Sequence, residues 1–272
     1  MQRHSFPIVT TDALGRRLRV DAPPKRIVSL VPSQTELLAD LGLGTRVIGV
    51  TRFCVHPEDW REEKTVVGGT KQLNNDTVQA LTPDLVLANK EENTPAMVEA
   101  LDALAPVYVS DVATLPDALG MIRAVGRLTG TAPRADALAA EIDAAFAALP
   151  PAPPLRVAYL IWRAPYMSVG GDTFIHAMLR RAGFVNAFAD QQRYPEVTLD
   201  DLRALRLDAV LLASEPFPFG RPRFAEEVRE ALPHTRVEVV DGELFSWYGS
   251  RLLQAPSYFT ALRERLPGAA AS

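Results

Sequence analysis

The chain has 272 residues, of which 47% are hydrophobic and 23% are charged, and its 29 Lys and Arg against 33 Asp and Glu give a formal net charge of −4 at pH 7. This mildly acidic balance argues against nucleic-acid binding, because contacts to phosphates require a basic surface. The single cysteine, Cys54, excludes an internal disulfide framework and a cysteine-rich zinc site.

The N-terminal residues 1–7 contain no apolar stretch of the kind found in secretion signals, and no run reaches the roughly 18 consecutive apolar residues of a membrane span. We expect a periplasmic or other extracytoplasmic location if a signal was removed, and a cytoplasmic location if Met1 is the native start. Residues 8–10 and 18–20 are β-prone runs around a turn that contains Gly15, so they predict a β-hairpin.

Short apolar runs then alternate with helical patterns. The run 26–31 predicts a buried strand, and a helix is expected from Pro32, with a hydroxyl available as its cap and Gly42 at its end. Further strands are predicted at 47–50, 66–67, 85–88 and 107–109. Because a parallel connection has to cross the face of the sheet, this alternation indicates an α/β domain with a mainly parallel sheet over residues 1–114.

Between residues 115 and 150 the apolar period becomes helical, and we expect a linker whose second helix bridges two domains. After the proline-rich stretch 150–154, strands predicted at 156–161, 210–213 and 237–240 indicate a second α/β domain over residues 151–272. A ligand cleft is expected between the two lobes. The apolar stripes of the two linker helices are Leu115, Leu119, Ile122 and Val125, and Leu138, Ile142, Phe146 and Leu149.

The two halves of the chain repeat each other at a separation of 124 residues, since seven positions match between segments 75–91 and 199–215. Each segment contains a helix start, an apolar helix, an aspartate in a turn, an apolar strand and a glutamate after the strand. The pattern predicts two similar lobes. The matching pairs are Asp76 and Asp200, Ala80 and Ala204, Leu81 and Leu205, Asp84 and Asp208, Val86 and Val210, Leu87 and Leu211, and Glu91 and Glu215.

Common enzyme motifs do not occur: the sequence has no phosphate-binding loop, no serine-hydrolase elbow and no zinc-protease helix. Residues 170–173 are interpreted as a helix start rather than an anion site. Cys54 and His56 are two residues apart and would point the same way on an extended segment, which suits a soft metal or a thiolate–imidazole pair. A buried cysteine and a loop histidine is the favoured alternative, because no third ligand is close in sequence.

Charged and aromatic residues follow several predicted strands. Residues 90–93 read Lys-Glu-Glu-Asn after the strand at 85–88, and the carboxyl ends of parallel strands are where α/β proteins bind ligands. Aromatic rings in such loops suit a wall for a large planar or macrocyclic ligand, although each ring equally suits the end of a domain core. These aromatic residues are Phe53, Trp162, Tyr166, Tyr194, Phe217, Phe219, Phe245, Trp247 and Tyr248.

Asp76 and Asp200 each lie two residues after a potential helix cap, Asn74 and Thr198. A carboxylate in the first turn of a helix interacts favourably with the helix dipole, which explains either residue alone. A symmetric pair of acids, one in each lobe, also suits docking onto a two-fold partner with basic sockets.

Several motifs occur in a specific order from residue 9 to residue 266. They read Thr-Asp-Ala-Leu-Gly-Arg at 11–16, Pro-Lys-Arg-Ile-Val-Ser-Leu at 24–30, Pro-Ser-Gln-Thr-Glu-Leu-Leu at 32–38 and Leu-Thr-Pro-Asp-Leu-Val at 81–86, followed by a strand–loop–helix pattern at 158–183. In these motifs the sequence resembles the substrate-binding proteins of ABC importers for cobalamin, haem and ferric siderophores, the helical-backbone metal-receptor group. Within that group it is most similar to the cobalamin-binding proteins.

The resemblance implies a monomeric protein of two lobes on a long helix, which captures a corrinoid or another metal chelate, such as haem or a ferric siderophore, for an ABC permease dimer. It implies no enzymatic activity, no nucleic-acid partner and no resident metal or covalent cofactor. The docking carboxylates of the family map onto Asp76 and Asp200, where the family usually has Glu. A tryptophan of the family is Thr70 here, next to Lys71, which leaves a polar or anionic chelate open.

Two alternatives to this function remain open on the same fold. One is a cytoplasmic protein that binds a metal cofactor, and the other is an enzyme that handles a tetrapyrrole or a metal. For the favoured function, the residues predicted to contact the ligand are Ser33, Gln34, Phe53, Thr70, Lys71, Lys90, Glu91, Trp162, Tyr166, Tyr194, Trp247 and Arg251.

Overall fold

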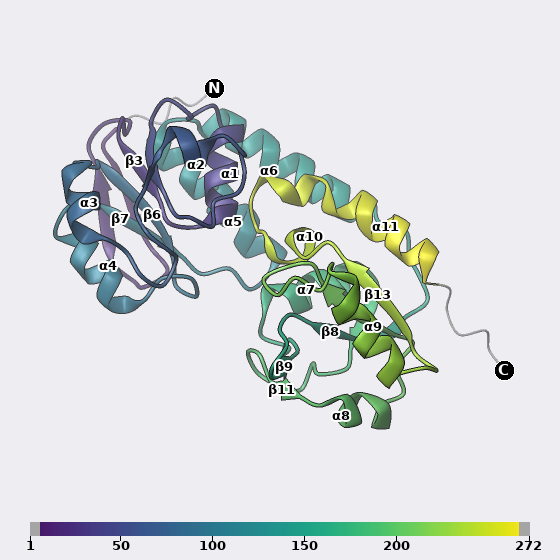
Figure 1. The fold of residues 1–272 in the computed structure, drawn as a ribbon. Coiled ribbons are helices and arrows are strands. Elements are labelled where there is room, and N and C mark those ends of the chain that lie inside the picture. Colours follow the sequence, from purple (N-terminus) through teal and green to yellow (C-terminus); the bar gives the residue numbers. More distant parts are fainter. Residues whose placement is uncertain (1–5, 267–272) are drawn as a thin grey trace. The chain divides into compact units, whose positions relative to one another are not determined.

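The computed structural model describes residues 6–266, which fold as two compact units (Figure 1). The first unit contains the described chain up to Val112, residues 116–142 and residues 248–251. The second contains residues 113–115, residues 143–247 and the described chain from Leu252 onward. The helical segment 115–150, which the sequence suggested as a separate linker, is therefore divided between the two units.

The first unit is built on a five-stranded parallel sheet in the order β5-β4-β3-β6-β7, preceded by an antiparallel hairpin of β1 (Ile8–Thr11) and β2 (Arg17–Val20). The predicted hairpin and parallel sheet are both confirmed. The strands are β3 (Ile27–Ser29), β4 (Val47–Val50), β5 (Thr65–Val66), β6 (Leu85–Asn89) and β7 (Val107–Ser110). The helices are α1 (Pro32–Asp40), α2 (Trp60–Glu63), α3 (Asn75–Ala80), α4 (Pro95–Asp102), α5 (Leu115–Thr129) and the first part of α6 (Ala132–Ala147).

The helices α3 and α4 cover one face of this sheet (Figure 1). Val78 of α3 and Leu101 of α4 pack, fully buried, against Val28 and Val86 of the strands. Successive side chains of a strand point to opposite faces, so Ile27 of β3 and the alternate residues of the neighbouring strands fill the other face of the sheet. Every residue of β3 and β6 is therefore buried. This burial explains why the strands appear in the sequence as continuous apolar runs.

Helix α1 begins differently from the expectation of a hydroxyl cap. Its N-cap is Val31, whose side chain makes no capping hydrogen bond, and Pro32 occupies the first turn. Proline needs no hydrogen-bond partner for its nitrogen there and its fixed φ suits the helix. At the other end, Gly42 adopts a φ of +78° and donates to the carbonyl of Ala39, as the sequence predicted.

The second unit contains a four-stranded parallel sheet in the order β10-β8-β12-β13 and a small antiparallel pair, β9 with β11. Together with the first sheet it confirms the predicted α/β class. Strands β9, β10 and β11 were not predicted, because each has only two or three residues. The strands are β8 (Leu155–Leu160), β9 (Tyr166–Met167), β10 (Phe184–Asn186), β11 (Glu196–Val197), β12 (Ala209–Ala213) and β13 (Arg236–Val240), and the helices are α7 (Phe174–Arg181), α8 (Leu199–Ala204), α9 (Pro222–Ala231), α10 (Glu243–Ser246) and α11 (Ala255–Arg265).

The helices α8 and α9 cover one face of the second sheet, while α7 and α10 lie on the other (Figure 1). Leu202 of α8 and Val228 of α9 are buried against Leu160 and Leu212. On the opposite face, the ring of Tyr159 packs 5.2 Å from that of Phe245 in α10. Each unit thus has its own core, with helices on both faces of a parallel sheet.

The buried face of α6 agrees with the predicted stripe at Ile142 and Phe146, which are buried, but not at Leu138, which is only half-buried, whereas Ala135 and Ala139 are fully buried. The small residues are needed because α5 and α6 approach closely: a Cβ on Gly126 would lie 2.2 Å from the Cβ of Ala135. A pattern based on large apolar residues misses the part of a helix face that is made of alanine.

The internal repeat corresponds to one shared structural device. In the first unit, the carboxylate of Asp84 accepts hydrogen bonds from the backbone N–H groups of Lys25 and Arg26, at 2.7 and 2.8 Å. In the second unit, Asp208 accepts one from the backbone of Arg156 at 2.6 Å. In both units the aspartate precedes a central strand, β6 or β12, and fastens the start of its neighbour, β3 or β8.

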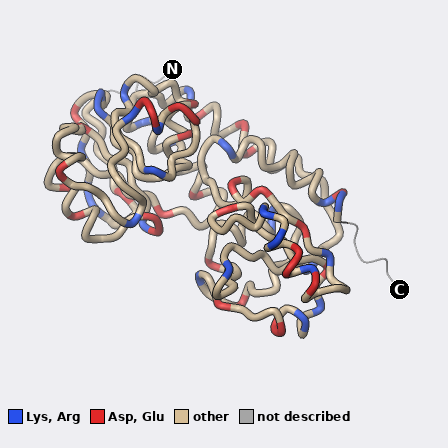
Figure 2. The backbone as a smooth tube through the Cα atoms, in the orientation of Figure 1, with Lys and Arg blue, Asp and Glu red and all other residues tan. Residues whose placement is uncertain are grey.

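Acidic and basic residues are interspersed over the backbone of each unit (Figure 2). Of the helices that the structure describes, none combines the length and the apolar character needed to cross a membrane.

Candidate functional site

In the first unit, a buried asparagine organises the loop at the carboxyl end of β6. Asn89 donates from Nδ2 to Ser110 Oγ at 3.1 Å, and its Oδ1 accepts from the backbone N–H groups of Glu91 and Glu92 at 2.8 and 3.2 Å. In turn, Oδ1 of Asn93 accepts a hydrogen bond from the backbone N–H of Asn89 at 2.9 Å. The charged loop predicted from the sequence is therefore held in one conformation.

Four predicted ligand contacts gather around this loop. Lys71 donates from Nζ to the carbonyl of Glu91, while the carbonyl of Thr70 accepts from Asn93 at 2.8 Å. Lys90 forms an ion pair with Asp111 at 2.7 Å. The sequence did not predict that Thr70 and Lys71 would lie against residues 90–93, because the contact depends on how the loops that follow β5 and β6 pack against each other.

The carboxylate of Glu92 lies among these groups. Burial raises its pKa, the negative charge of Glu91 adds to the effect, and Lys71 opposes it. A carboxyl group with a raised pKa binds a proton more readily than an exposed one. A cation, Lys71, therefore lies next to this loop, and the loop itself contains an acid, Glu92, whose pKa is raised.

Phe53 extends this group of residues with an exposed aromatic ring. Its side chain is 52% exposed, the guanidinium of Arg52 lies 5.7 Å from the ring centroid, and a Cβ on Gly69 would lie 3.2 Å from the ring. Phe53 thus lies beside the segment that carries Thr70 and Lys71. The first unit thus places Phe53 beside Gly69, and the adjoining Thr70 and Lys71 against residues 91–93.

Cys54 anchors the loop that carries Phe53. It is fully buried, and its Sγ lies 3.0 Å from Thr35 Oγ1 and 3.3 Å from Thr51 Oγ1. Burial is the main cause that raises the pKa of the thiol. His56 is half-buried and lines a separate surface pocket with acidic residues such as Glu58 and Asp59. Within residues 6–266, no group of three or more His, Cys, Asp or Glu side chains is placed to hold a metal ion.

Three other predicted ligand contacts of the first unit have side chains that are largely buried. Gln34 is fully buried and donates to Ser110 Oγ at 2.7 Å, so it supports the ends of β6 and β7. Ser33 is 3% exposed. Arg251 forms a bidentate ion pair with Glu36 of α1, at 2.6 and 2.9 Å, with both side chains almost buried. The structure does not bring these three side chains to the surface next to Phe53.

In the second unit, Trp162 and Tyr166 follow the end of β8. Trp162 is 40% exposed, and its ring packs edge-on against Phe217 at 5.7 Å. Tyr166 is half-buried and donates its hydroxyl to Glu227 of α9 at 2.7 Å. The sequence analysis selected both aromatic residues but missed Glu227, which is 61 positions away from Tyr166 and belongs to an unpredicted helix.

The two remaining aromatic predictions are placed differently. Tyr194 is half-buried, and the guanidinium of Arg193 lies 5.4 Å from its ring centroid. The backbone of Arg193 adopts a φ of +55° and donates to Asp172 at 2.6 Å. Trp247 is only 7% exposed, so most of its ring is covered in the structure.

The predicted docking acids lie in exposed first turns of matching helices. Asp76 belongs to α3, whose cap Asn74 accepts from the backbone of Thr77 at 3.1 Å. Asp200 belongs to α8, which Thr198 caps in a reciprocal arrangement with Asp201. Both caps were predicted. Asp200 differs from Asp76 in that it forms an ion pair with Arg203 on its own helix.

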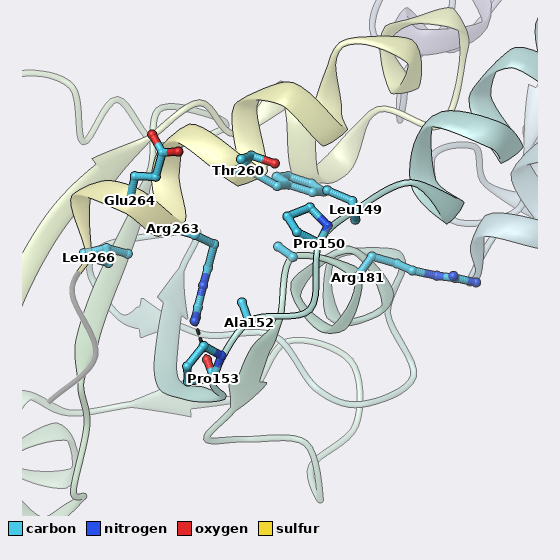
Figure 3. Close-up of a pocket in the computed structure, with 11 residues that line it drawn as sticks. Leu149, Pro150, Ala152, Pro153, Arg181, Thr260, Arg263, Glu264 and Leu266 are labelled. Carbon is cyan, nitrogen blue, oxygen red and sulfur yellow. Dashed lines mark hydrogen bonds between the residues drawn. The ribbon is translucent and has the colours of Figure 1, made fainter. Parts of the chain in front are cut away.

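A pocket of about 290 Å³ opens elsewhere in the second unit (Figure 3). It lies between α11 and the segment 149–153, and Arg263 extends across it to the carbonyls of Pro153 and Gly183. Pro153 and Ala182 precede the amino ends of β8 and β10. The pocket therefore lies at the amino ends of these strands, whereas Trp162 and Tyr166 follow the carboxyl end of β8. None of the predicted ligand contacts lines the pocket.

The chain is similar to known binding proteins over most of its length. The family model described as periplasmic binding protein matches residues 27–230. YvrC of Bacillus subtilis, described as an uncharacterized ABC transporter substrate-binding lipoprotein, is 30% identical over 268 residues, which cover 92% of this chain and 83% of that protein. A cobalamin-binding protein of Halobacterium salinarum is 32% identical over 205 residues, covering 71% of this chain and 55% of that protein.

The fold agrees with a solved structure. The periplasmic heme-binding protein RhuT of Roseiflexus, in its apo form, superposes with a TM-score of 0.79 at 23% identity, over 89% of this chain and 99% of that one. Proteins of the matched family bind small-molecule solutes and work with a permease, and they are not enzymes. The predicted class of protein is thereby confirmed: this chain belongs to the periplasmic binding protein family.

Proposed function

We propose that this protein captures a corrinoid or a related metal chelate and delivers it to an ABC permease. The observation that carries the proposal is the position of its exposed aromatic rings. Among the described residues, Phe53 and Trp162 are the Phe and Trp side chains that are exposed, and each follows the carboxyl end of a parallel strand. Exposed rings of this size are unfavourable in water and favour a ligand that covers them.

The surroundings of each ring suit a large conjugated ligand with polar substituents. Phe53 lies beside the guanidinium of Arg52 and against Gly69, two residues before Lys71, and Trp162 is supported by Phe217. A corrin or porphyrin ring can stack on such faces while its amide or carboxylate groups bind the cations. The description of the similar Halobacterium protein as cobalamin-binding, and of RhuT as heme-binding, supports this class of ligand.

Asp76 and Asp200 are proposed as the docking acids for the permease. Both are exposed in the first turn of a helix, and they occupy matching positions in the internal repeat. Because Asp200 would have to exchange its ion pair with Arg203 for one with the permease, we expect it to contribute less than Asp76. The descriptions of relatives as lipoprotein or periplasmic support an extracytoplasmic location.

Ligand binding is tested by titrating cyanocobalamin, hemin and ferrichrome while tryptophan fluorescence is recorded. Trp162 is the exposed indole, whereas Trp60 and Trp247 are 6% and 7% exposed. We expect quenching by at least one chelate, and loss of most of the signal change in Trp162→Phe. Flat titrations with all three chelates in the wild type would refute the proposal.

Variants of the exposed rings test where the chelate binds. Phe53→Ala and Trp162→Ala should each weaken the affinity roughly 3- to 10-fold, since an aromatic contact contributes about 0.5–1.5 kcal/mol beyond burial. Leu14→Ala and Val185→Ala, at apolar side chains that are 42% and 45% exposed, are the matched controls and should bind like the wild type. Equal losses in the controls would show that the effect is not specific to the rings.

Docking is tested separately, with the permease reconstituted in lipid vesicles. The double variant Asp76→Ala with Asp200→Ala should retain its affinity for the chelate but no longer stimulate ATP hydrolysis by the permease. Full stimulation by the double variant would show that the two acids serve only their helices.

A further inference from the structure

Four residues of the second unit form a connected cluster, which we call the Glu227 clamp: Arg163, Tyr166, Phe224 and Glu227. Arg163 lies in the turn after β8 and Tyr166 begins β9, while Phe224 and Glu227 lie three residues apart on α9, and therefore on one face of that helix. The clamp thus joins the loop that carries Trp162 to a helix more than 50 residues further along the chain.

The carboxylate of Glu227 is fully engaged within the clamp. Its Oε2 accepts from Arg163 Nε and Nη2 at 3.0 and 2.7 Å, and its Oε1 accepts from Arg163 Nε at 3.2 Å and from the Tyr166 hydroxyl at 2.7 Å. A bidentate arginine–carboxylate pair fixes the orientation of both groups, unlike a single contact to a lysine. The added phenol contact fixes Tyr166 to the same carboxylate.

The protonation states of the clamp follow from this geometry. The hydrogen bonds from Arg163 lower the pKa of Glu227, so the carboxylate is ionised at neutral pH and can only accept. Burial and the hydrogen bond to Glu227 raise the pKa of Tyr166 to about 12. Tyr166 is consequently a neutral phenol whose proton is directed to Glu227.

The arginine also orients the aromatic row. The guanidinium of Arg163 lies 5.4 Å from the centroid of Phe224, whose ring is 4.7 Å from that of Phe217. Phe217 in turn supports the exposed Trp162. Glu227 is therefore connected to Tyr166 directly and to Trp162 through Arg163 and two phenylalanine rings.

Stability alone is a weak explanation for so many contacts. The side chains of Arg163 and Glu227 are 33% and 38% exposed, and an ion pair in that environment contributes little to folding. The clamp lies next to Trp162, which the proposed function assigns to the ligand. This placement indicates a role in presenting the neighbouring side chains rather than in holding the unit together.

We infer that Glu227 is a positioning residue for ligand recognition: it engages the Tyr166 hydroxyl as a donor to its own carboxylate and holds the Arg163 guanidinium beside Phe224, so that this end of the unit presents rings and guanidinium donors but no free phenol oxygen for a metal. Ferric haem is held in some proteins by a tyrosinate, which needs a deprotonated phenol. The clamp therefore favours a chelate whose metal receives all its ligands from the chelator or from its own substituents. This inference rests on the proposed function, because it requires Trp162 and Tyr166 to touch the chelate.

The first test needs no ligand. The phenol of Tyr166 is followed by its absorbance at 295 nm during an alkaline titration, as the difference between each protein and its Tyr166→Phe counterpart. In Glu227→Gln, which keeps an acceptor but loses the charge, the titration should move from about 12 toward the ordinary value of 10.0. An unchanged titration would overturn the inference, since Glu227 would not control the phenol.

The second test uses cyanocobalamin and hemin as probes. Glu227→Ala and Tyr166→Phe should each weaken cyanocobalamin binding about tenfold. Because the two residues act as one unit, the double variant should bind cyanocobalamin no more weakly than the single variant with the lower affinity. Glu230→Gln, an exposed acid on the same helix, is the matched control. The absorbance spectrum of hemin added to the wild type and to Tyr166→Phe should be the same.

The outcomes separate the inference from the proposed function. A wild type that binds neither probe refutes the proposed function and this inference with it. A wild type that binds cyanocobalamin, together with a Glu227→Ala variant that binds it equally well, overturns the inference alone. A hemin band that disappears in Tyr166→Phe would also overturn it, because it would show tyrosinate ligation.

Discussion

Replacing the repeated aspartates should destabilise the two units unequally. Asp84 accepts two backbone hydrogen bonds at the start of β3, whereas Asp208 accepts one at the start of β8. Both aspartates are half-buried, and each bond is given a net value of about 1 kcal/mol. Asp84→Ala should therefore lower the free energy of unfolding by about 2 kcal/mol, and Asp208→Ala by about 1 kcal/mol.

Urea unfolding followed by circular dichroism, with scanning calorimetry to assign the affected unit, measures this difference. Asp84→Asn keeps one acceptor oxygen and should lose about half as much stability as Asp84→Ala. Glu99→Ala, at an exposed position of α4, is the control and should change stability by less than about 0.5 kcal/mol. Equal losses at Asp84 and Asp208, or an Asn variant as unstable as the Ala variant, would refute the hydrogen-bond explanation.

Three further predictions concern packing, thiol reactivity and pH. Gly126→Ala should destabilise the protein by about 1–3 kcal/mol in urea because of the close helix contact, whereas Gly120→Ala, with nothing within 4 Å, should stabilise it slightly. Cys54 should react slowly with a disulfide reagent in the native protein and quickly in concentrated urea, since burial raises its pKa; fast native reaction would contradict this. Burial lowers the pKa of His176 below 6.5, so the unfolded chain binds a proton first as the pH falls, and stability should decrease from about pH 6.5 downward. His176→Gln, which can still accept from Asn186, should reduce that decrease in pH-dependent urea midpoints; an unchanged slope would assign it to other groups.

The elements that were predicted correctly share a local cause. Strands β6 and β12 are buried on both faces, so the runs 85–88 and 209–213 are apolar, and the caps Asn74 and Thr198 each bond to a residue three positions further along the chain. Asp84 and its counterpart in the repeat, Asp208, have the same structural role, since each accepts backbone hydrogen bonds at the start of a neighbouring strand. A feature can be predicted from the sequence when its physical cause lies within one helix or strand or in the residues directly beside it.

The errors have a different origin. Part of the buried face of α6 consists of alanine because α5 approaches at Gly126, and strands β9, β10 and β11 have only two or three residues, so they are defined by the strand that each one pairs with. The hydrogen bond from the amide of Gln34, a predicted ligand contact, to Ser110, 76 residues away, was not predicted either. None of these three features is encoded in a local period, because each is decided by what packs against the element.

The sequence by itself therefore determined the α/β class, the duplicated lobes and the family, since these depend on periodicity, caps and motif order. Only the tertiary structure decided which residues meet: Phe53 with Gly69, Lys71 with Glu91, and Tyr166 with Glu227. Such pairs join segments about 15 to 60 residues apart, and their geometry arises from the packing of loops at the ends of parallel strands. For this reason the sequence contained the residues of the candidate site but not their partners.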